Sequence, residues 1–167
     1  EADVKKLVGF GTRHTMSDTI SQTRGIGAAR RWIRAEFEKI SKECGGCLEI
    51  YEQRSFVKAG PKTRITKDTW VVNVYAVKRG TKYPNRYVIM SGDIDSRVSD
   101  VLNYTDDSPG ANDNATGMAG AIELARVLSK YEFQSSVLLA GLSGEEQGLF
   151  GGKFLAQRAK DEEWEIA

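Results

Sequence analysis

No stretch of this chain approaches the roughly 20 consecutive apolar residues that a membrane-spanning helix needs. Neither sign of charge is in excess, since 24 lysines and arginines stand against 23 aspartates and glutamates. The chain lacks the net field that would draw it to nucleic acid or to an anionic membrane, and we expect neither as a partner. The composition, 40% hydrophobic and 28% charged, is typical of a globular protein with one substantial core. We predict a single domain over residues 1–167.

Cysteine and histidine are also scarce. Cys44 and Cys47, in a Cys-Gly-Gly-Cys segment, are too few for a four-ligand structural zinc site. They close a predicted helix, whereas the thiols of a thioredoxin-like motif open one, so a local disulfide, two inert thiols and a redox pair stay open as alternatives. A disulfide would favour an exported protein, and we expect a secreted or periplasmic location. The one histidine, His14, lies in a polar N-terminal segment, where we expect a structural role.

What the sequence does contain is an alternation of helical and strand-like patterns. Ile26, Ile33 and Ile40, with charged residues between them, indicate a helix over 26–43 with one buried stripe. A short N-terminal helix is expected before it. After it we expect strands at 48–57, 70–77, 87–90 and 137–142 and helices at 116–130 and 149–160. Strands followed by helices predict an α/β layer fold with a largely parallel central sheet, in which active sites gather at the carboxyl ends of the strands.

Three groups of acidic residues stand where strands end or helices begin. Asp93 and Asp95 follow the strand at 87–90, Glu145 and Glu146 follow the strand at 137–142, and Asp113 precedes the helix at 116–130. Neighbouring carboxylates at the end of a buried strand repel each other and lose hydration unless a cation or a proton compensates. One edge of the sheet would collect all three groups, so we predict the site of a divalent-metal hydrolase there.

The segments Gly110-Ala-Asn-Asp-Asn-Ala-Thr-Gly-Met118 and Gly144-Glu-Glu-Gln-Gly-Leu149, in this order and about thirty residues apart, resemble the M28 family of co-catalytic zinc aminopeptidases. The N-terminal Gly9-Phe-Gly-Thr-Arg-His-Thr15 is similar to the lead-in of that family, and the likeness extends through nearly all of the chain. The resemblance implies a three-layer α/β/α fold with a mixed, largely parallel sheet. It also implies a peptide substrate, two zinc ions in a complete site, and cleavage of N-terminal peptide bonds.

The same resemblance assigns roles to four acidic residues. Asp113 would bridge two zinc ions, and the peptide bond after it is commonly cis in the family. Glu146 would bind one of the ions. Glu145 would be the general base that takes a proton from a metal-activated water, a task for which a nearby carboxylate is chemically suited. Asp95 would be the acid that orients the metal ligand two residues before it.

The chain departs from the family pattern in two places. Asp93, in Ser91-Gly-Asp-Ile-Asp-Ser96, stands where the family has a metal-binding histidine. Aspartate can bind zinc, but it is a harder ligand and would favour manganese or another oxygen-preferring ion. The family draws a further carboxylate and histidine from beyond the Gly-Glu-Glu motif, so we expect the N-terminal part of a catalytic domain with three of five ligands. Such a piece would be inactive by itself, and a homodimer or a complementing C-terminal segment would complete it.

Each motif also has a simpler interpretation. Glu145 and Glu146 could be a solvated helix start, Asp113 could belong to an N-cap turn, and Asp93 could be part of an exposed acidic loop. Two other functions stay open: a glutaminyl cyclase-like enzyme with a single zinc, which a weakened second site would suit, and a catalytically dead binding domain. The presence of Glu145, needed only for proton transfer, speaks against the last. The zinc content per chain separates the three cases, as two, one or none.

Overall fold

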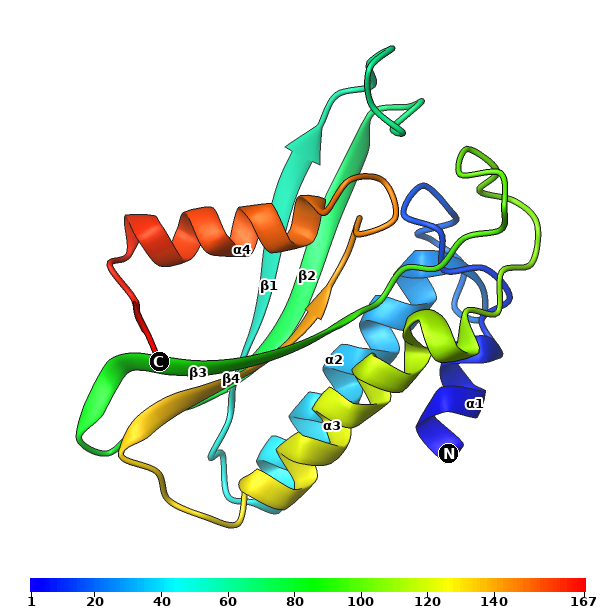
Figure 1. The fold of residues 1–167 in the computed structure, drawn as a ribbon. Coiled ribbons are helices and arrows are strands. Elements are labelled where there is room, and N and C mark those ends of the chain that lie inside the picture. The colour runs from blue at the N-terminus through cyan, green and yellow to red at the C-terminus, as the bar shows by residue number, and fades with distance from the viewer.

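The structure is a computed structural model that describes all of residues 1–167. A five-stranded sheet lies between two layers of helices (Figure 1). The helices are α1 (Ala2–Val8), α2 (Gly25–Glu43), α3 (Thr116–Leu128) and α4 (Phe150–Asp161), and a one-turn π-helix, η1 (Ala111–Ala115), precedes α3. The strands are β1 (Glu49–Val57), β2 (Thr69–Lys78), β3 (Tyr83–Asp93), β4 (Ser135–Leu142) and β5 (Glu165–Ile166). No helix is both long and apolar enough to cross a membrane.

The sheet is mixed, as the sequence predicts, with strand order β1-β2-β4-β3-β5. Pairing is antiparallel between β1 and β2 and between β2 and β4, and parallel between β4 and β3 and between β3 and β5. The parallel part is therefore smaller than the sequence analysis predicts, because β1 and β2 form a hairpin joined by residues 58–68. Parallel pairing is confined to the half of the sheet from which the acidic residues emerge.

The three-layer arrangement follows from where the apolar residues point. α2 and α3 cover one face, where an 18-residue cluster includes Ile33, Phe37 and Ile122. α4 covers the other face, where Leu155 packs against Tyr75 and Leu138. β2 is buried on both faces over nearly its whole length, which explains why its sequence does not alternate.

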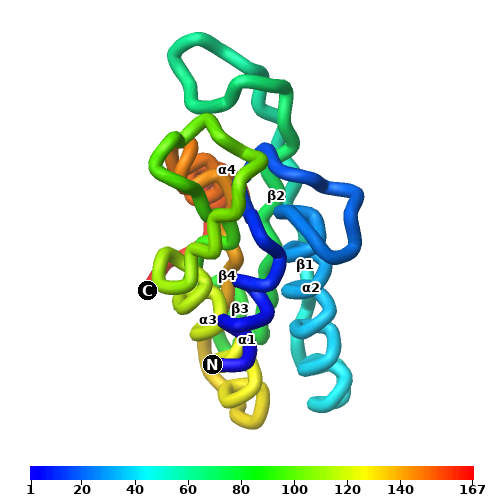
Figure 2. Tube along the Cα trace, turned by 90° about the vertical axis from the view of Figure 1, so that its right-hand side faces the viewer, coloured from blue at the N-terminus to red at the C-terminus, as the bar shows by residue number.

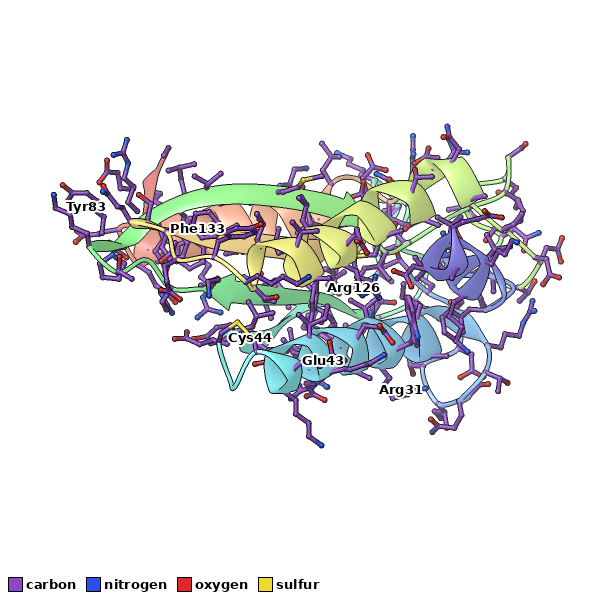
Figure 3. All side chains as sticks on the ribbon, turned by 90° about the horizontal axis from the view of Figure 1, so that it is seen from below. Arg31, Glu43, Cys44, Tyr83, Arg126 and Phe133 are labelled. Atoms are coloured by element: carbon purple, nitrogen blue, oxygen red, sulfur yellow. A yellow bond between two sulfur atoms is a disulfide. The ribbon has the colours of Figure 1, made fainter.

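Ion pairs hold the helical layer together. Arg126 of α3 pairs with Asp3 of α1 at 2.8 Å and with Glu36 of α2 at 2.9 Å (Figure 3). At the far end of α2, Cys44 forms a disulfide with Cys47. Of the three states that the sequence leaves open for these cysteines, the structure contains the disulfide.

Three loops gather at one end of the molecule. They connect α1 to α2, β1 to β2, and β3 to η1, and they surround the carboxyl ends of β3 and β4 (Figure 2). Since loops on a rigid scaffold carry function disproportionately, this end is where a site is expected.

Candidate active site

Two parallel strands carry the acidic residues to one edge of the sheet. Asp93, the last residue of β3, stands opposite Leu142, the last residue of β4. The amide of Ile94 then donates a hydrogen bond of 2.7 Å to the carbonyl of Leu142, so the two segments leave the sheet side by side. The aspartates that follow β3 therefore lie beside the two glutamates that follow β4.

Asp95 holds the turn that carries the glutamates. Its side chain is 1% exposed and accepts the backbone amides of Glu145 at 3.2 Å and Glu146 at 3.1 Å. The hydroxyl of Thr15 donates a third bond at 3.1 Å. Burial raises the pKa of the Asp95 carboxyl to about 6, although the three hydrogen bonds act in the opposite direction. This carboxyl is thus fully engaged with the protein, and it fixes the backbone from which both glutamates project.

Asp113 lies in the irregular turn before α3. The backbone leaves the helical conformation there (φ −109°, ψ 100°), and the peptide bond to Asn114 is cis, as the family resemblance implies. The Asn114 side chain turns back toward the sheet, where its Nδ2 donates to Oδ2 of Asp93 at 3.0 Å, while its Oδ1 accepts the amide of Gly117 at 2.8 Å. A Cβ on Gly92 would come within 2.3 Å of the Gly117 backbone, so glycine at the end of β3 permits this close approach.

A cavity of about 790 Å³ opens beside this cluster. Three of the five predicted carboxylates, those of Asp113, Glu145 and Glu146, line it. Asp93 is half-buried and is not among the lining residues. The lining also includes four cationic side chains, those of Lys62, Arg64, Arg97 and Lys153.

The carboxylates act on one another electrostatically. Burial raises the pKa of Asp93, and the charges of Asp113 and Glu146 raise it further, whereas the bond from Asn114 lowers it. Burial also raises the pKa of Glu145, with further increases from Asp93, Glu146 and Asp113. Asp93 and Glu145 therefore resist ionisation beside their acidic neighbours, which is the environment that a bound cation relieves.

The donor set suits an oxygen-preferring divalent cation. Carboxylates bind zinc, manganese and magnesium, and the mutual repulsion of these groups gives such an ion a stabilising role. As the side chains stand, however, no three histidine, cysteine, aspartate or glutamate side chains are grouped so that they could hold a metal ion. Nε of Arg97 lies 2.5 Å from Oε2 of Glu146, and Asn114 occupies Oδ2 of Asp93. Both contacts would have to open for these two carboxylates to bind metal through the same oxygens.

Three residues contact the site carboxylates although the sequence does not predict a role for them there. Thr15 and Asn114 lie inside motifs that the sequence analysis quotes, but their side-chain bonds to Asp95 and Asp93 depend on long-range contacts. Arg97 follows Asp95 by two residues, and nothing in its surroundings in the sequence indicates a bond to Glu146.

His14 lies buried behind the glutamate turn. Its Nδ1 accepts the amide of Met16 at 3.1 Å, and its Nε2 lies 3.1 Å from the carbonyl of Val101 and 3.0 Å from the side-chain amide of Gln147. Burial lowers the pKa of the His14 ring. These contacts give the histidine a structural role, as the sequence analysis expects, because both ring nitrogens are occupied by the protein.

Comparison with known proteins gives a consistent result. The model of peptidase family M28 matches residues 73–167. A probable zinc metalloprotease of Pyrenophora tritici-repentis is 50% identical over 161 residues, which are 96% of this chain and 33% of that protein. A second, from Leptosphaeria maculans, is 47% identical over 161 residues, 96% of this chain and 37% of that protein. The chain thus spans about a third of the length of these curated relatives.

Solved structures share the fold at low identity. LapB from Legionella pneumophila has a TM-score of 0.72 and 22% identity, and the match covers 99% of this chain and 39% of LapB. The glutaminyl cyclase of Fimbriiglobus ruber also has a TM-score of 0.72, with 20% identity over 99% of this chain and 56% of that enzyme. The two matches confirm the predicted α/β fold.

Proposed function

The chain belongs to peptidase family M28, and on that basis we propose that it supplies the carboxylate part of the active site of a metal-dependent exopeptidase that removes N-terminal residues from peptides. One observation carries the proposal: Asp95 accepts the amides of both Glu145 and Glu146. This bond pair joins the ends of two parallel strands and presents two adjacent carboxylates at one edge of the sheet.

We assign the metal-holding role to Asp93, Asp113 and Glu146. The fungal relatives are probable zinc metalloproteases, which supports zinc as the ion, with two ions in a complete site. The all-carboxylate set leaves room for manganese. Such an ion supplies the Lewis acidity that polarises a carbonyl and makes water nucleophilic at neutral pH.

Glu145 is the proposed general base. Glu145 lines the cavity, and burial, together with three acidic neighbours, raises the pKa of its carboxyl. A carboxylate with a raised pKa accepts the proton of an attacking water more readily and returns it to the leaving amine. Asp95 is a positioning residue in this scheme, since its oxygens are committed to the backbone of the turn and to Thr15.

Calorimetric titration of the 167-residue protein with ZnCl₂ and with MnCl₂ tests the proposal. We expect saturable binding that Asp113→Asn and Glu146→Gln weaken at least tenfold, while Glu145→Gln retains it. Asp106→Asn, an exposed loop substitution, serves as the matched control. Absence of binding, or equal binding by all four variants, would refute the assignment of the metal ligands.

A glutaminyl cyclase-like activity is the second candidate. The observation that favours it is the position of Asp93, which is bonded to Asn114 and does not line the cavity. A site without this ligand would hold one ion rather than two. In a form of the protein that carries the complete metal site, metal stoichiometry separates the candidates: two ions per protein support the exopeptidase, one ion supports the cyclase-like enzyme, and none supports a binding domain without catalysis.

We further propose that the outer edge of β3 pairs with an additional strand, from a second copy or from a complementing segment. β5 pairs with only Arg86 and Tyr87 of this eleven-residue strand. An apolar hollow beside the edge, which includes Ile89, Leu155 and Ile166, would be covered by the same addition. Light scattering tests the dimer. We expect the 167-residue protein to show no peptidase turnover, since the three assigned carboxylates are too few to hold two zinc ions.

A location outside the cytosol is also proposed, as secreted or periplasmic. The Cys44–Cys47 disulfide supports it, because disulfides persist mainly in oxidising compartments. Thiol titration of protein purified from the culture medium under denaturing, non-reducing conditions should find no free thiol. Recovery of the protein only from the cytosol, with two free thiols, would contradict the proposal.

A further inference from the structure

A second polar cavity, of about 480 Å³, lies between the first turns of α2, the β1–β2 hairpin and the loop before α2. Its lining includes four cationic side chains and two acidic ones: Arg30, Arg31, Arg54, Lys67, Glu52 and Asp68. It lies outside the cavity of the proposed active site and shares no lining residue with it. Its volume is in the range of pockets that bind small molecules.

Arg30 is the residue that sets this cavity apart. Its side chain is 7% exposed, and its Nε and Nη2 atoms are buried without any hydrogen-bond partner. Burial lowers its pKa to about 10, so the guanidinium remains charged at neutral pH. A buried charge without partners is costly, and native proteins compensate for it with a counter-ion or with bonds to every donor.

The acidic groups nearby are already engaged. Glu52 is paired with Arg34 at 3.3 Å and with Arg54 at 2.7 Å, and Oδ1 of Asp68 accepts the amide of Ala59 at 2.9 Å. Asp95, the acid that most stabilises the charged form of Arg30, has both oxygens bonded to other donors. The protein therefore supplies no carboxylate of its own to the two buried, unpartnered nitrogens of Arg30.

Hydrogen bonds and close packing fix the loop that lies beside Arg30 against α2. Arg31 donates to the carbonyls of Thr19, Ile20 and Ser21, which fixes the loop before α2 against the helix. Figure 3 shows Arg31 at the N-terminal end of α2, beside this loop. A Cβ on Gly27 would come within 2.4 Å of the Thr19 carbonyl, so loop and helix are in direct contact.

We propose that this cavity is an oxyanion-binding site in which Arg30 holds a phosphate or carboxylate group. Its Nε and Nη2 atoms are covered by protein in the structure without ligand, so the guanidinium turns toward the cavity when the anion binds and gains the partner that these donors lack. The planar guanidinium presents parallel N–H donors that match two oxygens of such a group, and the surrounding cations add long-range attraction. Nothing in the proposed peptidase chemistry uses this site, and the inference stands independently of it.

The site has a direct connection to the proposed active site. Thr15 lines the oxyanion cavity, and its hydroxyl donates to Asp95, which in turn holds the amides of Glu145 and Glu146. An anion beside Arg30 would therefore sit one side chain away from the residue that positions the catalytic turn.

Thermal unfolding with added anion tests the proposal on the 167-residue protein in metal-free buffer. Sodium phosphate and sodium succinate are the two probes, and sodium chloride at matched ionic strength is the reference. At ten times the dissociation constant, a site-bound anion should raise the melting temperature by about 3 to 6 °C. A larger response to phosphate identifies a phosphate-type ligand, and a larger response to succinate a carboxylate-type ligand.

Arg30→Met is the decisive variant, since it keeps an unbranched apolar stem and removes the charged guanidinium. We expect it to abolish the anion response and to melt no lower than the wild type in chloride, because a buried charge without partners has been removed. Arg30→Lys should keep the positive charge but lose the two parallel N–H donors of the guanidinium, so we expect it to bind phosphate or succinate at least tenfold more weakly. Arg86→Met, which removes a half-exposed arginine paired with Glu165 on β5, is the matched control and should respond like the wild type.

Two results would overturn the proposal. The first is a wild-type protein whose melting temperature in phosphate and in succinate equals that in chloride. The second is an unchanged anion response in Arg30→Met, or in Arg30→Lys should the methionine variant not fold. Nitrogen-15 NMR of the Arg30 Nε group gives a direct check, because its resonance should shift with phosphate and saturate at the same concentration as the melting response.

Discussion

The carboxylate of Asp95 accepts the backbone amide of Glu146, with 3.1 Å between Oδ2 and the Glu146 nitrogen. Its Oδ1 accepts the preceding amide, that of Glu145. The contact with Glu146 spans 51 residues of sequence and joins the segment after β3 to the segment after β4. Because Oδ2 also accepts the Thr15 hydroxyl, the carboxylate ties three segments of chain together. It explains how the turn keeps one conformation although it carries two adjacent like charges.

We expect Asp95→Asn to destabilise the protein by about 1 to 3 kcal/mol. The asparagine side chain has one accepting oxygen and one NH₂ group. The carboxylate accepts a backbone N–H at each of its two oxygens, so the NH₂ group leaves one of these N–H groups without an acceptor. The urea midpoint of unfolding measures the effect. Asp161→Asn on the exposed side of α4, where the carboxylate accepts only a bond from Gln157, is the control and should change the midpoint little. Equal effects of the two substitutions would show that Asp95 does not hold the turn.

Stability should also depend on pH through His14. Burial lowers the pKa of the ring below its ordinary value of 6.5, so the unfolded chain binds the proton more readily than the folded protein. This contribution to stability is complete above about pH 6.5 and is lost as the pH falls toward the folded-state pKa. The structural reason is that protonation would place a hydrogen on Nδ1, which accepts the Met16 amide.

The raised pKa values of Asp93, Asp95 and Glu145 act in the opposite direction and increase stability as the pH falls. The contribution of His14 is therefore measured as the difference in unfolding free energy between the wild type and His14→Gln, in which the effects of the three acids cancel. We expect the unfolding free energies of the two proteins to differ more at pH 7.5 than at pH 5.5. A constant difference between the two proteins across this range would exclude titration of His14 as a cause.

The two neighbouring glutamates should behave differently. In an active form of the protein, Glu145→Gln should lower turnover by about 10² to 10⁴-fold and leave metal content nearly unchanged, since the proposed role is proton transfer. Glu146→Gln should instead lose metal, and added metal should restore part of the activity. Metal analysis and initial rates on both variants decide the matter. If Glu145→Gln lost metal and regained activity when metal was added, the two assignments would be interchanged.

Much of this architecture can be predicted from the sequence, for identifiable reasons. The helices α2, α3 and α4 each bury one apolar stripe, and the acidic residues follow strands whose apolar character is plain, so the edge where they meet follows from topology. β5 has only two residues and carries no pattern. The parallel share of the sheet is overestimated because a run of buried residues in β2 does not reveal whether the neighbouring strand is parallel.

Side-chain partners across the fold are the part that sequence cannot supply. Arg97 reaches Glu146 and Asn114 reaches Asp93 only because β3, η1 and the glutamate turn converge in space. The sequence pattern of α2 places Arg30 beside the buried stripe, but it does not predict that two of its nitrogens lack hydrogen-bond partners. Such features depend on which donors and acceptors remain after all others have paired.

Asp93 determines how closely the metal site follows the family pattern, and its bond to Asn114 makes this testable. We expect Asp93→His to bind zinc more tightly relative to manganese than the wild type, because imidazole is a softer ligand than carboxylate and adds no negative charge. Competition between the two ions, followed by calorimetry, measures the ratio. Asn114→Ala is the control: it breaks the bond to Asp93 without changing the ligand, so it should free the carboxylate and leave the zinc-to-manganese ratio near the wild-type value. If Asp93→His left both the affinity and the ratio unchanged, Asp93 would be a structural acid that anchors Asn114, and the metal would be held by Asp113 and Glu146 without it.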